Sequence, residues 1–348
     1  MITVVIPFRN GAQYLDSCIG SVLNQTYKDI EIICVDDGSD DGSESVCKKY
    51  SDKGVQYLRQ EKLGVSVARN KGIDGAHGKY IMFLDVDDTL TTNIVEILYL
   101  EMESDESLDI IACCCNGILR DRTVVDHFFE GDFIATSLKE KRKLFLQLLD
   151  NQYGQPQKEY TAIGVPWGKL YRVDFLREKN IRFKKNLRRM QDNIFNQEAF
   201  YKAEKIKYLD QPLYNYSIDH IMHIGMKDPE NMKSIILHHE DIVKLYLGDS
   251  EVEELIHREK VAFLVDSVEY CAMMCSNSKE AIDNIKNIAE DACYLDVYEK
   301  SNYRKSLYRR ILIDSLSHKL YSFSYYLTRV SIIKKYIRMR QDRILIRK

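Results

Sequence analysis

An apolar run that ends in acidic residues constrains this chain more than any other stretch. Residues 79–84 read Lys-Tyr-Ile-Met-Phe-Leu, which is typical of a buried strand. Asp85, Asp87 and Asp88 follow directly, with one valine among them. Crowded carboxylates favour a compensating cation, and ligand sets made only of oxygen favour Mg²⁺ or Mn²⁺ over zinc. The stretch therefore predicts a divalent metal site, unless Asp88 merely caps the next helix and the other two acids are solvated.

The first part of the chain alternates between strand-like and helix-like stretches. Apolar runs predict strands over residues 2–6, 30–35, 55–59, 80–84, 108–115 and 181–183. Helical spacing of apolar residues predicts helices over 13–26, 44–50, around 68–70, 93–102 and 173–179. We expect Pro7 to end the first strand, and the charged segment 120–160 shows no clear pattern. The alternation predicts an α/β layer with a mostly parallel sheet and right-handed connections.

Two acidic turns are expected at the same edge of this sheet. Asp36 and Asp37 follow the second strand, as Asp85 and Asp87 follow the fourth. Ligands of parallel α/β sheets bind at the carboxyl ends of the strands, so both turns should face one crevice. The first turn, residues 7–11, lacks the GxGxxG pattern, and no P-loop is present. A dinucleotide-dependent oxidoreductase is therefore disfavoured.

Composition excludes several further classes. The chain has 50 basic and 53 acidic residues and a net charge of −3, which argues against nucleic-acid binding. Its nine cysteines form no CxxC pair, so we expect small apolar side chains in a reducing compartment. We find no signal-peptide pattern and no apolar stretch of about 18 residues or more. We therefore expect a cytoplasmic protein without a transmembrane helix.

Three later features have two interpretations each. Asp192 precedes a helical run, where it would be a helix N-cap or first-turn acid, or a functional carboxylate. Trp167, the only tryptophan, would line a ligand pocket or pack in the core. His220 and His223 would either supply a metal ligand or have no role in the site.

Several short motifs occur together in one order. They lie at residues 4–7 with Asn10, and at 21–27, 35–39, 64–72, 80–88, 167–171 and 213–216. In these motifs the chain resembles the family 2 glycosyltransferases of bacterial polysaccharide synthesis, from residue 2 to about 218. The resemblance implies a GT-A nucleotide-diphospho-sugar transferase fold over residues 1–220, followed by a C-terminal α-helical extension over 221–348.

The resemblance also implies an activity. Such enzymes move a hexosyl or N-acetylhexosaminyl group from a nucleotide-diphospho-sugar, here a UDP-sugar, with inversion at the anomeric carbon. The acceptor would be a glycan or a lipid-linked oligosaccharide in capsule, exopolysaccharide or O-antigen biosynthesis. Neither the donor sugar nor the acceptor can be read from the residues.

Donor-binding roles follow from the resemblance residue by residue. Pro7 would lie at the nucleotide pocket, and Asp37 would accept from the uracil N3–H with Asp36 beside it. Arg69 would lie near the nucleotide or diphosphate. Lys169 would approach a phosphate, or would simply be solvated.

The reaction roles come from the same resemblance. Asp85 and Asp87 would form the DxD motif that holds Mn²⁺ or Mg²⁺, with Asp87 as a direct ligand. Asp192 corresponds to the aspartate of a Glu-Asp pair, the general base. Here Gln191 replaces the glutamate, and an amide cannot accept a proton at neutral pH, so Asp192 would act alone.

The end of the chain has a different composition. Helical patterns are expected over residues 232–247, 252–274 and 279–294, and past Asn302 the chain becomes basic and aromatic. Such segments suit an anionic membrane surface, where each basic residue contributes about 1 kcal/mol. A helical cap with a solvated charged face, or a partner-binding helix, are the alternatives. We expect peripheral association with the inner face of the cell membrane.

Two other classes remain as alternatives to the enzyme. A catalytically silent nucleotide-sugar-binding subunit of a polysaccharide synthase complex is compatible with Gln191, although the aspartates 85, 87 and 192 argue against it. A nucleotidyltransferase is disfavoured because the first turn lacks the glycine-rich, basic character that binds a triphosphate.

Overall fold

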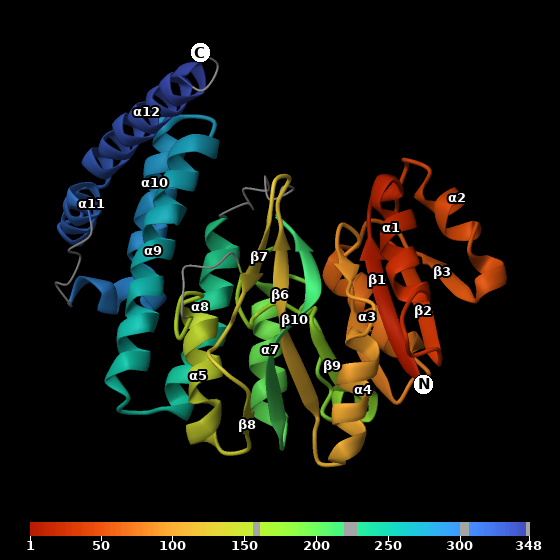
Figure 1. Cartoon of the computed structure of the whole chain (residues 1–348). Helices are drawn as coiled ribbons and strands as arrows, with labels where there is room; N and C mark the ends of the chain where they lie inside the picture. The colour runs from red at the N-terminus through yellow and green to blue at the C-terminus, as the bar shows by residue number, and fades with distance from the viewer. Residues whose placement is uncertain (156–160, 219–227, 300–305, 346–348) are drawn as a thin grey trace. The chain divides into compact units, whose positions relative to one another are not determined.

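The structure is a computed structural model that describes residues 1–155, 161–218, 228–299 and 306–345, with side chains described to Lys335 in the last range. The chain divides into two compact units, Met1–Ile224 and Gly225–Lys348 (Figure 1). The boundary expected at residue 220 lies outside the described residues.

The first half of the sheet is parallel. A ten-stranded sheet forms from the described residues in the order β3-β2-β1-β4-β9-β6-β10-β5. Its parallel part consists of β1 (Ile2–Phe8), β2 (Ile30–Asp36), β3 (Val55–Arg59) and β4 (Tyr80–Phe83). The strands β1 and β4 are buried throughout, as expected for strands covered by helices on both faces.

The second half of the sheet is mixed. β9 (Lys169–Arg172) runs antiparallel between β4 and β6 (Ile110–Ile118), and β10 (Ile206–Ser217) runs parallel to β6. Three short antiparallel strands complete it, namely β5 (Thr89–Leu90), β7 (Thr123–Asp126) and β8 (Phe133–Ala135). The sheet is thus mixed: the pairings from β3 to β4 are parallel, as predicted for a mostly parallel sheet, whereas most pairings of the second half are antiparallel. The predicted α/β class is confirmed.

Seven helices flank this sheet in the described part of the first unit (Figure 1). They are α1 (Ala12–Leu23), α2 (Ser43–Lys48), α3 (Val65–Gly75), α4 (Ile94–Ser104), α5 (Leu138–Leu149), α6 (Val173–Glu178) and α7 (Gln191–Lys202). A short 3₁₀ turn, η1 (Ser51–Lys53), precedes β3. The predicted helices of this unit are confirmed, with ends that shift by a few residues.

Two local predictions are wrong. The first strand does not end before Pro7 but runs to Phe8. β4 pairs with β1 only as far as Val5, so the missing N–H of Pro7 breaks no ladder hydrogen bond on that side. The strand expected over residues 181–183 is a loop.

Segment 120–160, which showed no clear pattern, contains β7, β8 and α5. A capping box starts α5: Ser137 Oγ accepts from the N–H of Glu140 at 3.3 Å, and Glu140 Oε2 accepts from the N–H of Ser137 at 2.9 Å. This Ser-x-x-Glu spacing is a sequence signal for a helix start that could have revealed α5.

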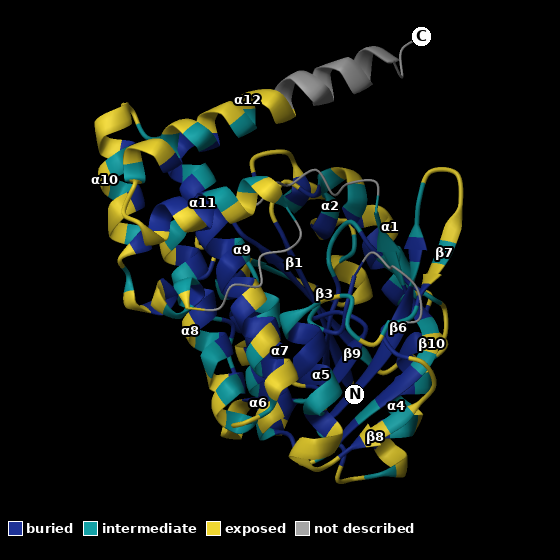
Figure 2. Ribbon diagram, turned by 90° about the vertical axis from the view of Figure 1, so that its left-hand side faces the viewer, coloured by how far each residue is buried: buried dark blue, intermediate teal, exposed yellow. Residues whose placement is uncertain are grey.

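The second unit is helical. It comprises α8 (Pro229–Leu245), α9 (Ser250–Met274), α10 (Ser278–Ala289), the 3₁₀ segment η2 (Ala292–Tyr298), α11 (Leu307–Ser317) and α12 (Tyr321–Leu345). The long helix α9 is the centre of the unit, because α8, α10, α11 and α12 all contact it. Figure 2 shows that its ribbon is largely buried. Among the described helices, none is both long and apolar enough to cross a membrane.

Close packing of α3 on β1 gives a test of the fold. A Cβ at Gly72 would lie 2.7 Å from Val5 Cγ2 and closer still to Val5 Cγ1, so Gly72→Ala should lower the free energy of unfolding by about 1–3 kcal/mol. Gly75→Ala in the same helix is the matched control, since the nearest atom there, Ile33 Cδ1, is 3.7 Å away. Urea unfolding of both variants measures the difference. Equal stabilities would contradict the packing.

Candidate active site

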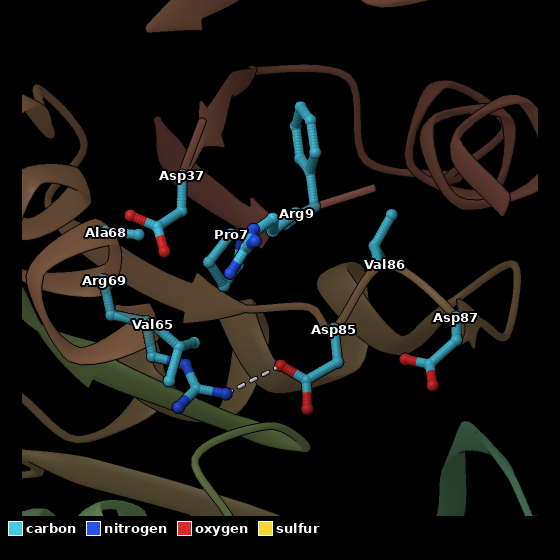
Figure 3. Close-up of a pocket in the computed structure, with 10 residues that line it drawn as sticks. Pro7, Arg9, Asp37, Val65, Ala68, Arg69, Asp85, Val86 and Asp87 are labelled. Atoms are coloured by element: carbon cyan, nitrogen blue, oxygen red, sulfur yellow. Dashed lines mark hydrogen bonds and ion pairs between the residues drawn. The ribbon is translucent and has the colours of Figure 1, made fainter. Parts of the chain in front are cut away.

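A cavity of about 310 Å³ lies at the carboxyl ends of the parallel strands (Figure 3). Its wall comes from the ends of β1 and β2, the first turns of α3, and the turn after β4. The lining residues are Pro7, Phe8, Arg9, Asp37, Val65, Ala68, Arg69, Asp85, Val86 and Asp87. The sequence singled out five of these, namely Pro7, Asp37, Arg69, Asp85 and Asp87. The other five were missed because nothing in their local pattern marks them.

Arg69 joins two acids that lie far apart in the sequence. Its Nη2 donates to Asp85 Oδ1 at 2.8 Å, and its Nη1 donates to Asp192 Oδ1 at 2.5 Å. The guanidinium lies 5.2 Å from the ring centroid of Phe183. Burial disfavours its charge, but the carboxylates of Asp192 and Asp85 hold the pKa of Arg69 above its ordinary value. A permanent buried cation thus links the DxD turn to α7.

Asp192 occupies the first turn of α7. The helix N-cap is Met190, whose φ of 55° lies in the left-handed region, so the N-cap interpretation of Asp192 is wrong and the first-turn interpretation is confirmed. Burial raises the pKa of Asp192 above its ordinary value, and Arg69 opposes the rise. The side chain keeps 28% of its surface exposed, so a substrate hydroxyl could reach it.

Asp37 lines the cavity and also fixes its rim. Its Oδ1 accepts from Gln60 Nε2 and from the N–H of Leu63, each at 2.8 Å, and its Oδ2 accepts from the N–H of Gly64 at 2.9 Å. Gly64 has φ +92°, a conformation that favours glycine, and it is the N-cap of α3. One carboxylate therefore ties the end of β2 to the helix that carries Arg69.

Asp36 takes a structural position beside it. Its side chain is fully buried and accepts from the N–H of Ser39 at 2.7 Å, from Tyr57 Oη at 2.6 Å and from Arg59 Nη1 at 3.0 Å. These partners occupy both carboxylate oxygens, and Asp36 is not among the residues that line the cavity. Asp36 shapes the acidic turn, and Asp37 is the member of the pair that faces the cavity.

Asp88 points into the protein rather than into the cavity. Its Oδ2 accepts from Tyr214 Oη at 2.6 Å, and its Oδ1 accepts from the N–H of Ser217 at 2.8 Å. The helix-capping interpretation is wrong, because α4 starts at Ile94 with Asn93 as its N-cap. Asp88 instead attaches the turn after β4 to strand β10.

Tyr214 supports the DxD turn in two ways. Besides its bond to Asp88, its hydroxyl accepts from the N–H of Asp85 at 3.3 Å. Its ring stacks on Trp167 with centroids 4.2 Å apart and an angle of 6° between the planes. Trp167 is 2% exposed, which favours the interpretation that it packs in the core over the interpretation that it lines a ligand pocket. In the sequence Tyr214 was marked only as part of the motif at residues 213–216, and its contact with the acidic turn was missed.

Lys169 is not among the residues that line the cavity. It is fully buried, and its Nζ donates to the carbonyl of Val165 at 2.5 Å. Burial lowers the pKa of Lys169 to about 7. The structure places this ammonium in the interior rather than in solvent, and the expected phosphate contact stays a prediction.

Of the remaining candidates, the structure describes Gln191 but neither of the two histidines. Gln191 Oε1 is buried and makes no hydrogen bond within the described residues. His220 and His223 lie outside the described residues.

Asp85 and Asp87 fit a hard divalent cation. Both are carboxylates on the cavity wall, separated by one residue of a tight turn, and the Asp85 side chain is 30% exposed. An all-oxygen donor set of this kind suits Mg²⁺ or Mn²⁺. Asp88 is bound by β10, so Asp85 and Asp87 are the acids of this turn that line the cavity.

A second group of possible ligands lies elsewhere in the sheet. Cys114, His127 and Asp210 bring their ligand atoms within 4.8 Å of one another. Burial raises the pKa of the Cys114 thiol. His127 Nδ1 already lies 2.6 Å from Asp210 Oδ1. The group is explained by this ordinary pair.

Sequence comparison identifies the class of protein to which this fold and site belong. Residues 3–178 match the family described as "Glycosyl transferase family 2". The chain belongs to this family, as the resemblance predicted.

Two curated relatives have related sequences. One is the glycosyltransferase GlyA of Streptococcus pneumoniae, 33% identical over 220 residues that cover 62% of this chain and 30% of that protein. Another is the uncharacterized glycosyltransferase EpsJ of Bacillus subtilis, 33% identical over 218 residues that cover 62% of this chain and 60% of that protein. The matches thus span less than two thirds of either relative.

Solved structures share the fold. The S. aureus protein TarS (residues 1–349), solved in complex with UDP, superimposes with a TM-score of 0.65 at 17% identity, covering 96% of this chain and 91% of that one. The same protein was also solved with UDP-GlcNAc. The GT-A fold with a C-terminal helical region is thus confirmed.

The link between Asp88 and Tyr214 gives a test of the site. Tyr214→Phe removes the donor to a buried carboxylate oxygen, which should lower the free energy of unfolding by about 1–3 kcal/mol. Tyr201→Phe is the matched control, because Tyr201 is 50% exposed, and its effect should stay within about 0.5 kcal/mol. Urea unfolding measures both. A Tyr214→Phe protein as stable as the control would show that Asp88 does not depend on this hydroxyl.

Proposed function

We propose that this protein is a metal-dependent inverting glycosyltransferase that moves a hexosyl or N-acetylhexosaminyl group from a UDP-sugar to a glycan or lipid-linked acceptor. The pathway would be capsule, exopolysaccharide or O-antigen assembly. The observation that carries the proposal is the Arg69 bridge, because it holds Asp192 beside the cavity lined by Asp37, Asp85 and Asp87. One guanidinium thereby binds both Asp85, a candidate donor-binding residue, and Asp192, the candidate base.

The donor would enter the cavity with its base towards Asp37. Pro7 and Asp37 lie on one part of the wall, and Arg69, Asp85 and Asp87 lie on the other (Figure 3). A carboxylate at the base end suits a ring N–H donor such as uracil N3–H. TarS, which shares the fold, was solved with UDP and UDP-GlcNAc, and this supports uridine as the base.

The diphosphate would lie between Arg69 and the DxD turn. Asp85 and Asp87 would hold Mn²⁺ or Mg²⁺, which when bound neutralises charge on the departing nucleoside diphosphate. Arg69 adds a fixed positive charge at the same place. Because it also binds both acids, it sets the distance between the donor phosphates and Asp192.

Asp192 would act as the general base. Its carboxylate would take the proton of the acceptor hydroxyl while the oxygen attacks the anomeric carbon and the nucleoside diphosphate leaves. One displacement inverts the configuration, so one base is enough, in contrast to the two carboxylates of glycoside hydrolysis. The raised pKa of Asp192 brings it closer to the working pH of a base.

The acceptor would be met at the membrane. The basic and aromatic C-terminal stretch supports peripheral association with the anionic inner face of the cell membrane, where a lipid-linked acceptor would be found.

One observation keeps a second candidate function open. The amide Gln191 replaces an acid beside Asp192, and its Oε1 is buried without a hydrogen bond among the described residues. A silent nucleotide-sugar-binding subunit of a synthase complex could tolerate this change.

Donor hydrolysis tests the class of enzyme. The purified protein with a panel of UDP-, GDP- and dTDP-sugars and Mn²⁺ should release one nucleoside diphosphate, and a chelator should stop the release. Asp87→Ala should abolish the release because it removes a metal ligand, whereas Asp52→Ala, at an exposed site, should not. Release is measured by chromatography of the nucleotides.

Binding on the same panel separates the remaining outcomes. Tight, metal-dependent donor binding without turnover would favour the silent subunit. No binding of any donor would contradict the proposed function.

The base is tested by Asp192→Asn. An amide keeps an oxygen that can accept from Arg69 but cannot take a proton, so transfer should fall by about 10²- to 10⁴-fold while the donor dissociation constant stays nearly unchanged. Gln191→Glu is the matched neighbour, and it should retain activity. Transfer rates and donor binding are measured on the same preparations. Wild-type turnover in Asp192→Asn would place the base elsewhere.

A further inference from the structure

Helix α12 contacts α11 partly through polar residues. Ser324 and Thr328 are fully buried. The hydroxyls of Ser315 and Ser324 lie 2.7 Å apart, and Tyr308 Oη donates to Thr328 Oγ1 at 3.2 Å. The contact between α11 and α12 thus contains hydrogen-bonded hydroxyl groups, although α11 also buries the apolar Leu312, Ile313 and Leu316.

The opposite face of α12 is apolar and exposed. Its members share a spacing of three or four residues, so they form one stripe along the helix, and between 50% and 59% of each is exposed. They are Leu320, which directly precedes the helix, and Phe323, Tyr326, Val330 and Ile333. At about 1.5 Å per residue the stripe is about 20 Å long. Figure 2 shows the described part of α12 mainly in the colours of exposed and intermediate residues.

Basic residues border the stripe. Lys319 and Lys335 keep 73% and 63% of their side chains exposed while they pair with Glu290 at 3.9 Å and Glu269 at 3.1 Å, and Lys334 is exposed as well. The sequence of the last turns of α12 adds Arg338, Arg340 and Arg343 against one acid, Asp342. A continuous apolar stripe with a polar surround marks an interaction surface, and here the surround is positively charged.

We propose that α12 lies on an anionic lipid surface, with the stripe inserted among the lipids and the flanking lysines on the headgroups. The burial of the helix fits this position, because Ser324 and Thr328 are buried against the protein whereas the apolar stripe is exposed and would contact the lipid. The inference rests on the proposed function for the purpose of the contact, but the contact itself is argued from α12 alone.

Charge selects the lipid over a second copy of the chain. Two copies that met by this stripe would bring two basic segments together, which costs free energy, whereas an anionic surface is attracted to each. A surface position also agrees with the finding that no described helix is both long enough and apolar enough to cross a bilayer.

Flotation of the full chain with vesicles tests the contact. Wild-type protein should float with vesicles of phosphatidylglycerol and phosphatidylcholine and stay at the bottom with phosphatidylcholine alone. The double variant Phe323→Ser, Val330→Ser should partition about tenfold more weakly or worse. Lys334→Gln should weaken the partition about fivefold. Leu237→Ser, on α8 and 49% exposed, is the matched control and should float like wild type.

Two results would overturn the proposal. One is a wild-type protein that does not float, and the other is a double variant that floats like wild type. Light scattering is run in parallel, and a wild-type dimer that the double variant loses, without flotation, would assign the stripe to a second copy. Circular dichroism verifies that the variants are folded.

Donor hydrolysis without vesicles separates this proposal from the proposed function. The double variant lies outside the site and should hydrolyse donor at the wild-type rate. If no protein hydrolyses or binds donor, the proposed function fails while the flotation result still decides the membrane contact.

Discussion

The site depends on one buried charge. Arg69 is 3% exposed, and a buried guanidinium is tolerated only when acids compensate it. The two acids that do so come from the turn after β4 and from the first turn of α7. Pairing therefore fixes the distance between Asp85 and Asp192. The same requirement that stabilises the fold sets the geometry in which a donor phosphate and an acceptor hydroxyl would meet.

A second set of contacts holds the acidic turns rigid. Asp88 is bound by Tyr214 and Ser217 of β10, and Asp36 is bound by Ser39, Tyr57 and Arg59. Each turn thus has one buried acid that anchors it, beside acids that face the cavity, Asp37 in one turn and Asp85 and Asp87 in the other. This division gives adjacent aspartates different roles, since a carboxylate whose oxygens are all used inside the protein is not available to a ligand.

The C-terminal unit differs in which side chains it exposes. Its core is ordinary around α9, but α12 places serine and threonine against the protein and leaves its apolar stripe exposed. Exposure of that much apolar surface costs free energy in water unless another phase covers it. The basic residues around the stripe favour an anionic surface as that phase.

The sequence by itself determined the α/β class, most strand and helix positions in the first unit, the two acidic turns, and the family. These features depend on local periodicity or short motifs. Only the tertiary structure decided that Arg69 pairs with Asp192, 123 residues away, that Asp36 and Asp88 point inward, and that Lys169 is buried. It also decided the orientation of α12. Local patterns reflect neighbours along the chain, whereas these contacts arise from packing between distant segments, where burial forces each charge to find a partner.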